Sequence, residues 1–180
     1  MSNRIFIVPR VYFYKQMQLA GITDENVELN SGWAFISIQS TKALEPSESP
    51  YFKMDHENVL TLTFDDITDK DTDVLTQYKG SRLFDTTDAK KIISFVEKNK
   101  DRKFLIHCTA GISRSGAVGT FIQRVLGIGY KKFLKDNPNI SPNAYVLSVL
   151  MSEYRLTNGS VFGNVSNEQR KESDYAEETV

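Results

Sequence analysis

The sequence of 180 residues contains one cysteine, Cys108, and two histidines. One thiol cannot form an internal disulfide or supply a multi-cysteine metal site. The chain also lacks an apolar run near the roughly 20 residues that cross a bilayer. Its first residues carry no small-residue cleavage site of a secretion signal. A lone thiol without an export signal predicts a protein of the reducing cytoplasm.

The chain has almost no net charge, −1 at pH 7. A balanced chain has no general attraction to nucleic acid or to an anionic membrane, so we expect neither as a partner, and any anion site must be local. The oligomeric state stays open. From Gly163 onward the sequence is polar and charged, which predicts one domain over residues 1–162 and a weakly ordered tail over residues 163–180.

Strand-like and helix-like runs alternate along the chain. Strands are expected at Ile5–Val8, Trp33–Ile38, Val59–Phe64 and Phe104–Ile106. Helices are expected at Val11–Ala20, from an N-cap at Thr87 or Asp88 to about Lys98, from Ser115 to Gly127 and from Asn143 to Arg155. This alternation is typical of a parallel sheet covered by helices. We therefore predict a single α/β domain with a central, mainly parallel sheet of about four or five strands and helices on both faces.

The segment HCTAGISRSG, residues 107–116, joins the last expected strand to a helix. Backbone N–H groups and the positive end of the helix dipole then surround one point, which predicts an anion site and favours the thiolate of Cys108. The planar fork of Arg114 can hold two phosphate oxygens. Ser115 can donate its hydroxyl to the sulfur. The phosphate ligands expected are Thr109, Ala110, Gly111, Ile112, Ser113 and Arg114, with Gly111 allowing the turn that brings the amides inward.

The pattern His-Cys-x-x-Gly-x-x-Arg-Ser resembles the signature of the protein tyrosine phosphatase superfamily. The string HCTAGISRSGA, with LTFDDI upstream and Ser-Pro-Asn downstream, is similar to its small, dual-specificity-like bacterial branch. The resemblance is strongest from Val59 to Tyr154. It implies hydrolysis of phosphotyrosine first, with phosphoserine and phosphothreonine as further substrates, through a phospho-cysteine intermediate that needs no metal and no other cofactor. The partner implied is a phosphorylated protein or a small phosphomonoester.

Cleavage of a phosphoester also needs a proton donor for the leaving oxygen. In the superfamily this donor is an aspartate on a movable loop. Asp65 and Asp66 directly follow the expected strand, at the sheet edge where active sites collect. The resemblance favours Asp66 as the general acid. Asp65, Asp69 and Asp71 stay open as alternatives, as does an acidic loop that is only solvated.

Two further residues belong to the expected site. Neighbours on a strand point to opposite faces, so the ring of His107 is expected to pack away from the thiol, and the resemblance implies that it orients the loop. Asn143 of Ser141-Pro142-Asn143 resembles a segment near the phosphate pocket, where it would brace the loop or position water; a helix N-cap explains it equally well. The Trp-Pro-Asp acid loop of many tyrosine phosphatases is missing, because the only tryptophan, Trp33, lies in an expected strand.

The loop interior, Thr109 to Ser113, is uncharged. Relatives that act on inositol lipids tend to carry lysines there, so the resemblance favours a protein phosphomonoester whose aromatic ring packs against Ile112. Three alternatives stay open: a catalytically weak phosphate-binding or phosphoprotein-binding module, redox chemistry of an accessible thiolate, and a buried structural cysteine. With no second cysteine, an oxidised Cys108 has no internal resolving thiol.

Overall fold

The computed structural model describes residues 4–42, 44–45 and 49–158, so the expected domain end at residue 162 and the tail 163–180 lie outside the described residues. Within them the chain forms one four-stranded sheet in the order β1-β4-β2-β3. The strands are β1 (Ile5–Pro9), β2 (Trp33–Gln39), β3 (Val59–Thr63) and β4 (Lys103–Cys108). All three pairings are parallel, which confirms the predicted α/β class.

Strand β4 is central, and its side chains alternate between two apolar layers. Phe104 and Ile106 are fully buried in the larger core together with Cys108, while Leu105 belongs to a smaller aromatic cluster on the opposite face. Trp33 packs beside this second cluster, as expected of a packing residue. A strand buried on both faces is a rigid support for the loop that follows it.

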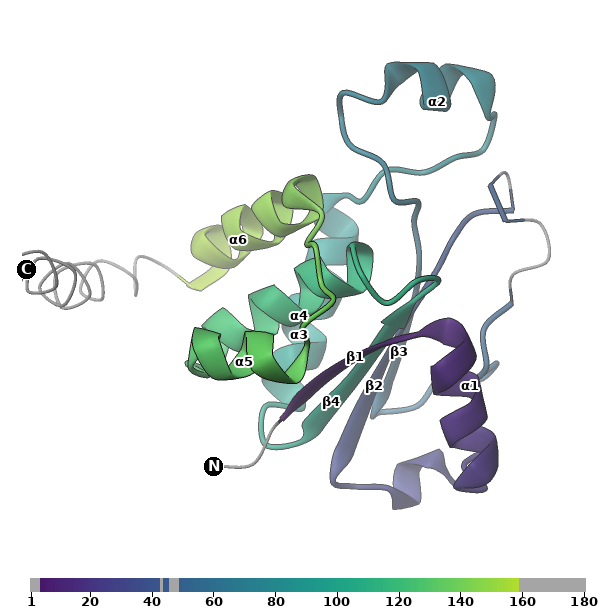
Figure 1. The fold of residues 1–180 in the computed structure, drawn as a ribbon, viewed down its shortest axis with the longest axis vertical. Helices are drawn as coiled ribbons and strands as arrows, with labels where there is room; N and C mark the ends of the chain where they lie inside the picture. The colour runs from purple at the N-terminus through teal and green to yellow at the C-terminus, as the bar shows by residue number, and fades with distance from the viewer. Residues whose placement is uncertain (1–3, 43, 46–48, 159–180) are drawn as a thin grey trace, which may run out of the picture.

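The sheet is covered on both faces, as predicted (Figure 1). Helix α1 (Arg10–Leu19) contributes to the aromatic cluster on one face, and the short η1 (Val27–Leu29) adds Val27. On the other face lie α3 (Thr86–Lys98), α4 (Arg114–Val125), α5 (Tyr130–Asp136) and α6 (Ala144–Asn158). Within the described chain, no helix is both long and apolar enough to cross a bilayer.

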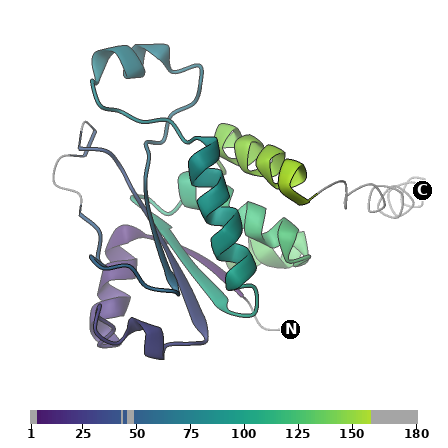
Figure 2. The same ribbon diagram turned by 180° about the vertical axis from the view of Figure 1, so that it is seen from behind.

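The main elements agree with the sequence-based expectations to within a few residues, and three short ones were not predicted. These are η1, α5 and α2 (Thr72–Gln77). Helix α2 buries no residue and stands apart from the layers (Figure 2). The N-cap of α3 was also wrongly predicted. Asp85, rather than Thr87 or Asp88, caps the helix in a reciprocal capping box with Asp88. The box offers two carboxylates to amides that a single Thr87 hydroxyl would leave unpaired.

Candidate active site

Cys108 is the last residue of β4, and α4 begins at Arg114. The intervening loop therefore lies at the carboxyl edge of the sheet, below the N-terminus of a helix of 12 residues. Strand end and helix start are both fixed by the core, because Phe104, Ile106, Val118 and Phe121 are all fully buried. The strand–loop–helix arrangement expected around Cys108 is present.

The loop is turned so that three of its carbonyl groups point outward. Thr109 O accepts a hydrogen bond from the backbone N–H of Arg10 at 3.2 Å. Ile112 O and Ser113 O accept from the backbone N–H groups of Ser141 and Asn143, each at 3.2 Å. A loop whose carbonyl groups are held on the outside presents its N–H groups to the inside, which is how backbone forms an anion-binding concavity.

Gly111 is required at its position in this loop. Its φ of +70° lies in the left-handed region, and a Cβ built there would lie 2.4 Å from Val8 C and from Pro9 N. Both contacts are with backbone, so no side-chain rearrangement could relieve them. The loop thus packs directly on the end of β1, and only glycine allows this close approach.

The environment of Cys108 favours the thiolate. Burial raises the pKa of the thiol, but hydrogen bonds from the side chain and the backbone of Ser115, the charge of Arg114 and the amide of Ile112 outweigh it, so the pKa lies below the usual value. Cys108 Sγ and Ser115 Oγ are 3.1 Å apart. Cys108 is 2% exposed, so its sulfur lies beneath the loop rather than at the surface.

Arg114 is buried, and one side of its guanidinium is fully engaged. Nη1 donates to Ser40 Oγ at 2.9 Å and to Phe64 O at 2.8 Å, and Nη2 donates to Thr109 Oγ1 at 3.0 Å. Nε, at the other edge of the guanidinium, is buried and has no hydrogen-bond partner among the described residues. An arginine has five N–H donors, so Nε–H and one Nη2–H remain as a parallel pair for two oxygens of one anion.

The two adjacent aspartates after β3 have different surroundings. Asp65 is fully buried and accepts from the backbone N–H and the hydroxyl of Thr41 and from the backbone N–H of Arg82, each at 2.8 Å. Asp66 is exposed, and its Oδ1 accepts from Ser113 Oγ at 2.7 Å and from Asn143 Nδ2 at 2.8 Å. The side chain of Asp66 thus lies over the loop of residues 109–113, here called the phosphate loop, whereas Asp65 holds the end of β3 in place.

The remaining candidate acids lie farther along the same connection. Asp71 accepts from the backbone and hydroxyl of Thr68, which closes a local turn before α2, and these bonds lower its pKa. Asp69 is exposed in that turn. The hydrogen bonds of Asp66 to Ser113 and Asn143 therefore favour it over both.

Asn143 combines the two roles that the sequence left open. Its Oδ1 accepts from the backbone N–H of Val146 at 3.1 Å in the first turn of α6, while its Nδ2 donates to Asp66. Its backbone N–H holds Ser113 O. One residue therefore connects the start of α6, the loop after Cys108 and Asp66.

His107 lies on the face of the sheet opposite to Cys108. Its ring packs on Phe13, with 4.3 Å between ring centroids, and its Nε2 lies 2.8 Å from Ser37 Oγ. Burial lowers the pKa of His107 to about 4. The ring is therefore neutral at physiological pH, and it packs away from the thiol, as expected.

Sequence reasoning missed two residues that touch the site. Ser40 follows β2 and binds Arg114, and Glu45 accepts from Thr109 Oγ1 at 3.0 Å and pairs with Arg10 at 3.5 Å. Ser40 could have been found, because it follows a parallel strand at the same carboxyl edge as Cys108. Nothing in the sequence around Glu45 indicates its contact. Ile112 is 39% exposed beside the loop, and no three His, Cys, Asp or Glu side chains of the described residues converge on a common metal position.

The sequence matches no family model and no curated protein. The structure is similar to the human tyrosine phosphatase-like serine/threonine/tyrosine-interacting protein, at 18% identity and a TM-score of 0.47, covering 86% of this chain and 93% of that one. It is also similar to the Cydia pomonella PTP-2 phosphatase, at 17% identity and a TM-score of 0.46 over 84% of this chain and 86% of that one. A third similar structure is human DUSP28, at 17% identity and a TM-score of 0.44, covering 87% of this chain and 94% of that one.

Proposed function

We propose that the chain hydrolyses phosphomonoesters through a covalent phospho-cysteine intermediate on Cys108. The observation that carries this proposal is the paired donor set of Arg114, with Nε–H and one Nη2–H unused, beside a sulfur whose pKa is lowered. Two parallel donors match two oxygens of a phosphoryl group. A thiol that reacts as thiolate also requires a reducing compartment, so we place the activity in the cytoplasm.

In the first step the Cys108 thiolate attacks phosphorus, an S–P bond forms and the P–O bond to the leaving group breaks. Arg114 and the inward-facing amides hold the non-bridging oxygens, whose charge spreads during the transfer. Asp66, in its protonated form, gives its proton to the leaving oxygen. Oδ1 is occupied by Ser113 and Asn143, so Oδ2 is the oxygen that carries the transferable proton.

In the second step the Asp66 carboxylate takes a proton from water, whose oxygen attacks phosphorus as the S–P bond breaks. The sulfur leaves with the electron pair of that bond, and inorganic phosphate is released. Ser115 Oγ, 3.1 Å from the sulfur, donates to the departing thiolate. The hydroxyl thus stabilises the same charge in the free enzyme and in the second transition state.

Phosphotyrosine on a protein is the proposed preferred substrate. The loop interior from Thr109 to Ser113 carries no cation that could bind further phosphate groups. Ile112, partly exposed beside the loop, offers an apolar surface to a phenyl ring. Phosphoserine and phosphothreonine suit the same chemistry, but they lack a ring to pack there, so they are expected to react more slowly.

The test is hydrolysis of para-nitrophenyl phosphate from pH 5 to 7.5 with EDTA present. Turnover that is abolished in Cys108→Ser and in Arg114→Ala supports the mechanism. Trapping of a phosphorylated protein that is absent in Cys108→Ser would identify the intermediate. A well-folded wild type that binds vanadate without turnover would replace the enzyme by a phosphate-binding module, the alternative function.

A further inference from the structure

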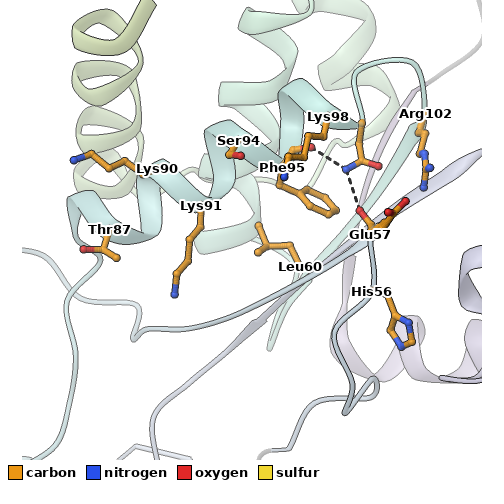
Figure 3. A pocket seen from close by; sticks show the side chains of 11 residues that line it. His56, Glu57, Leu60, Thr87, Lys90, Lys91, Ser94, Phe95, Lys98 and Arg102 are labelled. Carbon is orange, nitrogen blue, oxygen red and sulfur yellow. Dashed lines mark hydrogen bonds between the residues drawn. The ribbon is translucent and has the colours of Figure 1, made fainter.

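Strand β3 lies at one edge of the sheet and borders a pocket of about 780 Å³ between its outer side and helix α3 (Figure 3). The pocket is lined by Leu60 of β3, by one side of α3 and by Arg102 across the opening. A second hollow of about 310 Å³ lies farther along the same strand, beside Thr61 and Thr63, and Lys91 lines both. The two hollows together follow the length of β3.

The outer edge of β3 carries backbone groups without partners in the stretch between Val59, whose N–H donates to His56 O, and the C=O of Thr63, which accepts from Arg82 Nη1. Phe35 N–H donates to Asn58 O and Phe64 N–H donates to Gln39 O, so the even-numbered residues of the parallel ladder face β2. The N–H and C=O groups of Thr61 and the N–H of Thr63 therefore point outward. No described residue forms a hydrogen bond with them, and a strand edge of this kind accepts another strand.

Cations line the α3 side of this edge. Lys91, Lys98 and Arg102 line the pocket and form no ion pair within the described part of the chain, whereas Lys90 pairs with Glu153 and turns toward α6 (Figure 3). Glu57 is the one acidic side chain of the pocket lining. The pocket therefore has an excess of positive charge beside an unpaired strand edge.

The register of the strand relates these two features. Leu60 and Leu62 of β3 pack with the core residues that α3 covers, so the even-numbered side chains face α3. In a strand added beside β3, every second side chain would face the same way. Lys91 and Lys98 are seven residues apart on α3, or about 10 Å along the helix axis. Acidic residues at alternate positions of an added strand, about 7 Å apart, fall within reach of these flexible side chains.

We propose that the outer edge of β3 binds an extended acidic segment of a partner protein as an added strand. Main-chain hydrogen bonds to Thr61 and Thr63 hold the segment, and acidic side chains at alternate positions meet Lys91, Lys98 and Arg102. A nucleic acid or an anionic lipid has no backbone that pairs with Thr61, so the strand edge favours a peptide. The site does not involve Cys108, and it holds whether or not the phosphate loop is catalytic.

Fluorescence anisotropy with the full chain tests the proposal. The probe is a labelled nine-residue peptide of alternating threonine and glutamate, compared with a peptide of the same composition whose glutamates are contiguous. We expect the alternating peptide to bind at least about tenfold more tightly. The double change Lys91→Glu with Lys98→Glu is expected to weaken it at least about tenfold, because two attractions become repulsions.

A matched control reverses the same amount of charge on another helix. Lys131→Glu with Lys135→Glu on α5 alters two exposed lysines that form no ion pair within the described residues, and it is expected to change the affinity less than about twofold. Equal loss in both double variants, equal binding of the two peptides, or equal competition by a short RNA duplex would each reduce the site to a general polyanion surface and overturn the proposal.

The backbone contribution has its own test. Thr61→Pro removes an outward N–H without removing a bond to β2, so it is expected to abolish the preference for the alternating peptide, whereas Thr61→Val retains the N–H and the preference. Exchange of the Thr61 amide proton, followed by NMR in the wild type, is expected to slow when the peptide binds. A Thr61 amide that exchanges equally fast with and without bound peptide would overturn strand addition.

Discussion

Asp65 and Asp66 are neighbours in the sequence, yet one is fully buried beneath the end of β3 and the other lies over the phosphate loop. Asp65 accepts three hydrogen bonds, two from Thr41 and one from Arg82, while Asp66 accepts from Ser113 and Asn143. Asp65 holds the connection that follows β3 on the sheet, and Asp66 lies where it can reach a leaving group. Substitution of Asp65 therefore tests folding stability, and substitution of Asp66 tests the reaction.

Asp66→Asn is expected to lower the reaction rate, and Asp65→Asn is expected to lower the folding stability. Loss of a general acid typically lowers the rate about 100- to 10,000-fold, so Asp66→Asn should lower kcat by that order, and Tm should stay within a few degrees of the wild type. Asp65→Asn places an N–H₂ group where a carboxylate oxygen accepted, which costs about 1–3 kcal/mol of folding free energy.

The measurements for this pair are kcat for para-nitrophenyl and phenyl phosphate, together with urea denaturation. The defect of Asp66→Asn should be larger for phenyl phosphate, because phenolate is the poorer leaving group. Equal defects on both substrates would argue against proton donation by Asp66.

Ser115→Ala is expected to raise the pKa of Cys108. Burial alone raises this pKa, and the Ser115 hydroxyl is the first of the contacts that bring it below the usual value. Iodoacetamide modifies the thiolate, so its rate against pH reports the titration. In the wild type the midpoint should lie below that of an ordinary cysteine thiol, and in Ser115→Ala it should move upward. An unchanged midpoint in the variant would assign the shift to Arg114 and the amides.

Gly111→Ala can be compared with Gly21→Ala, because the two glycines have nearly the same positive φ. Their φ values are +70° and +63°, but a Cβ at Gly21 meets nothing within 4 Å, while one at Gly111 meets Val8 and Pro9. Gly21→Ala should cost about 1 kcal/mol of folding free energy from the left-handed conformation alone. Gly111→Ala should cost more and abolish vanadate binding. Urea denaturation and vanadate titration measure both effects, and retained vanadate affinity in Gly111→Ala would contradict the direct packing of loop on strand.

The lowered pKa of His107 predicts that the folded protein loses stability on mild acidification. Its pKa is about 4 in the folded protein and about 6.5 when unfolded, so below pH 6.5 the unfolded chain binds a proton that the folded one does not. The folding stability that comes from a neutral His107 is complete above pH 6.5 and is lost as the pH falls toward 4. Between pH 7 and pH 5 the loss amounts to about 2 kcal/mol of the free energy of unfolding. The free energy of unfolding of His107→Asn should fall by less over this interval, and an equal fall in both proteins would point to other groups.

Much of the site could be predicted because it is local in the sequence. The segment from His107 to Gly116 contains the end of the strand, the glycine of the turn, the arginine and the start of the helix. Each of these positions accepts few residue types for physical reasons. The opposite facing of His107 and Cys108 followed from the two-residue period of a strand. The preference for Asp66 over Asp65 came from resemblance, and the hydrogen bonds supply the physical reason for it.

The partners of this local segment could not be predicted. Arg10 lies 99 residues before Thr109, whose carbonyl it holds, and Glu45 comes from a connection without periodicity. Short helices such as α2 and α5 also escaped, because six or seven residues do not show a helical period. Asp85 was missed as a cap because the expected helix started too late along the chain.

The three outward carbonyl groups of the phosphate loop have a consequence for the order of folding. Their donors, Arg10, Ser141 and Asn143, lie near both ends of the described chain. A ribosome-bound chain that has emerged only as far as Gly127 contains β1, β4 and α4, but it lacks two of the three donors that hold the loop open. Contacts between distant segments form late. During synthesis the loop after Cys108 therefore gains its full set of outer hydrogen bonds only when the segment before α6 docks.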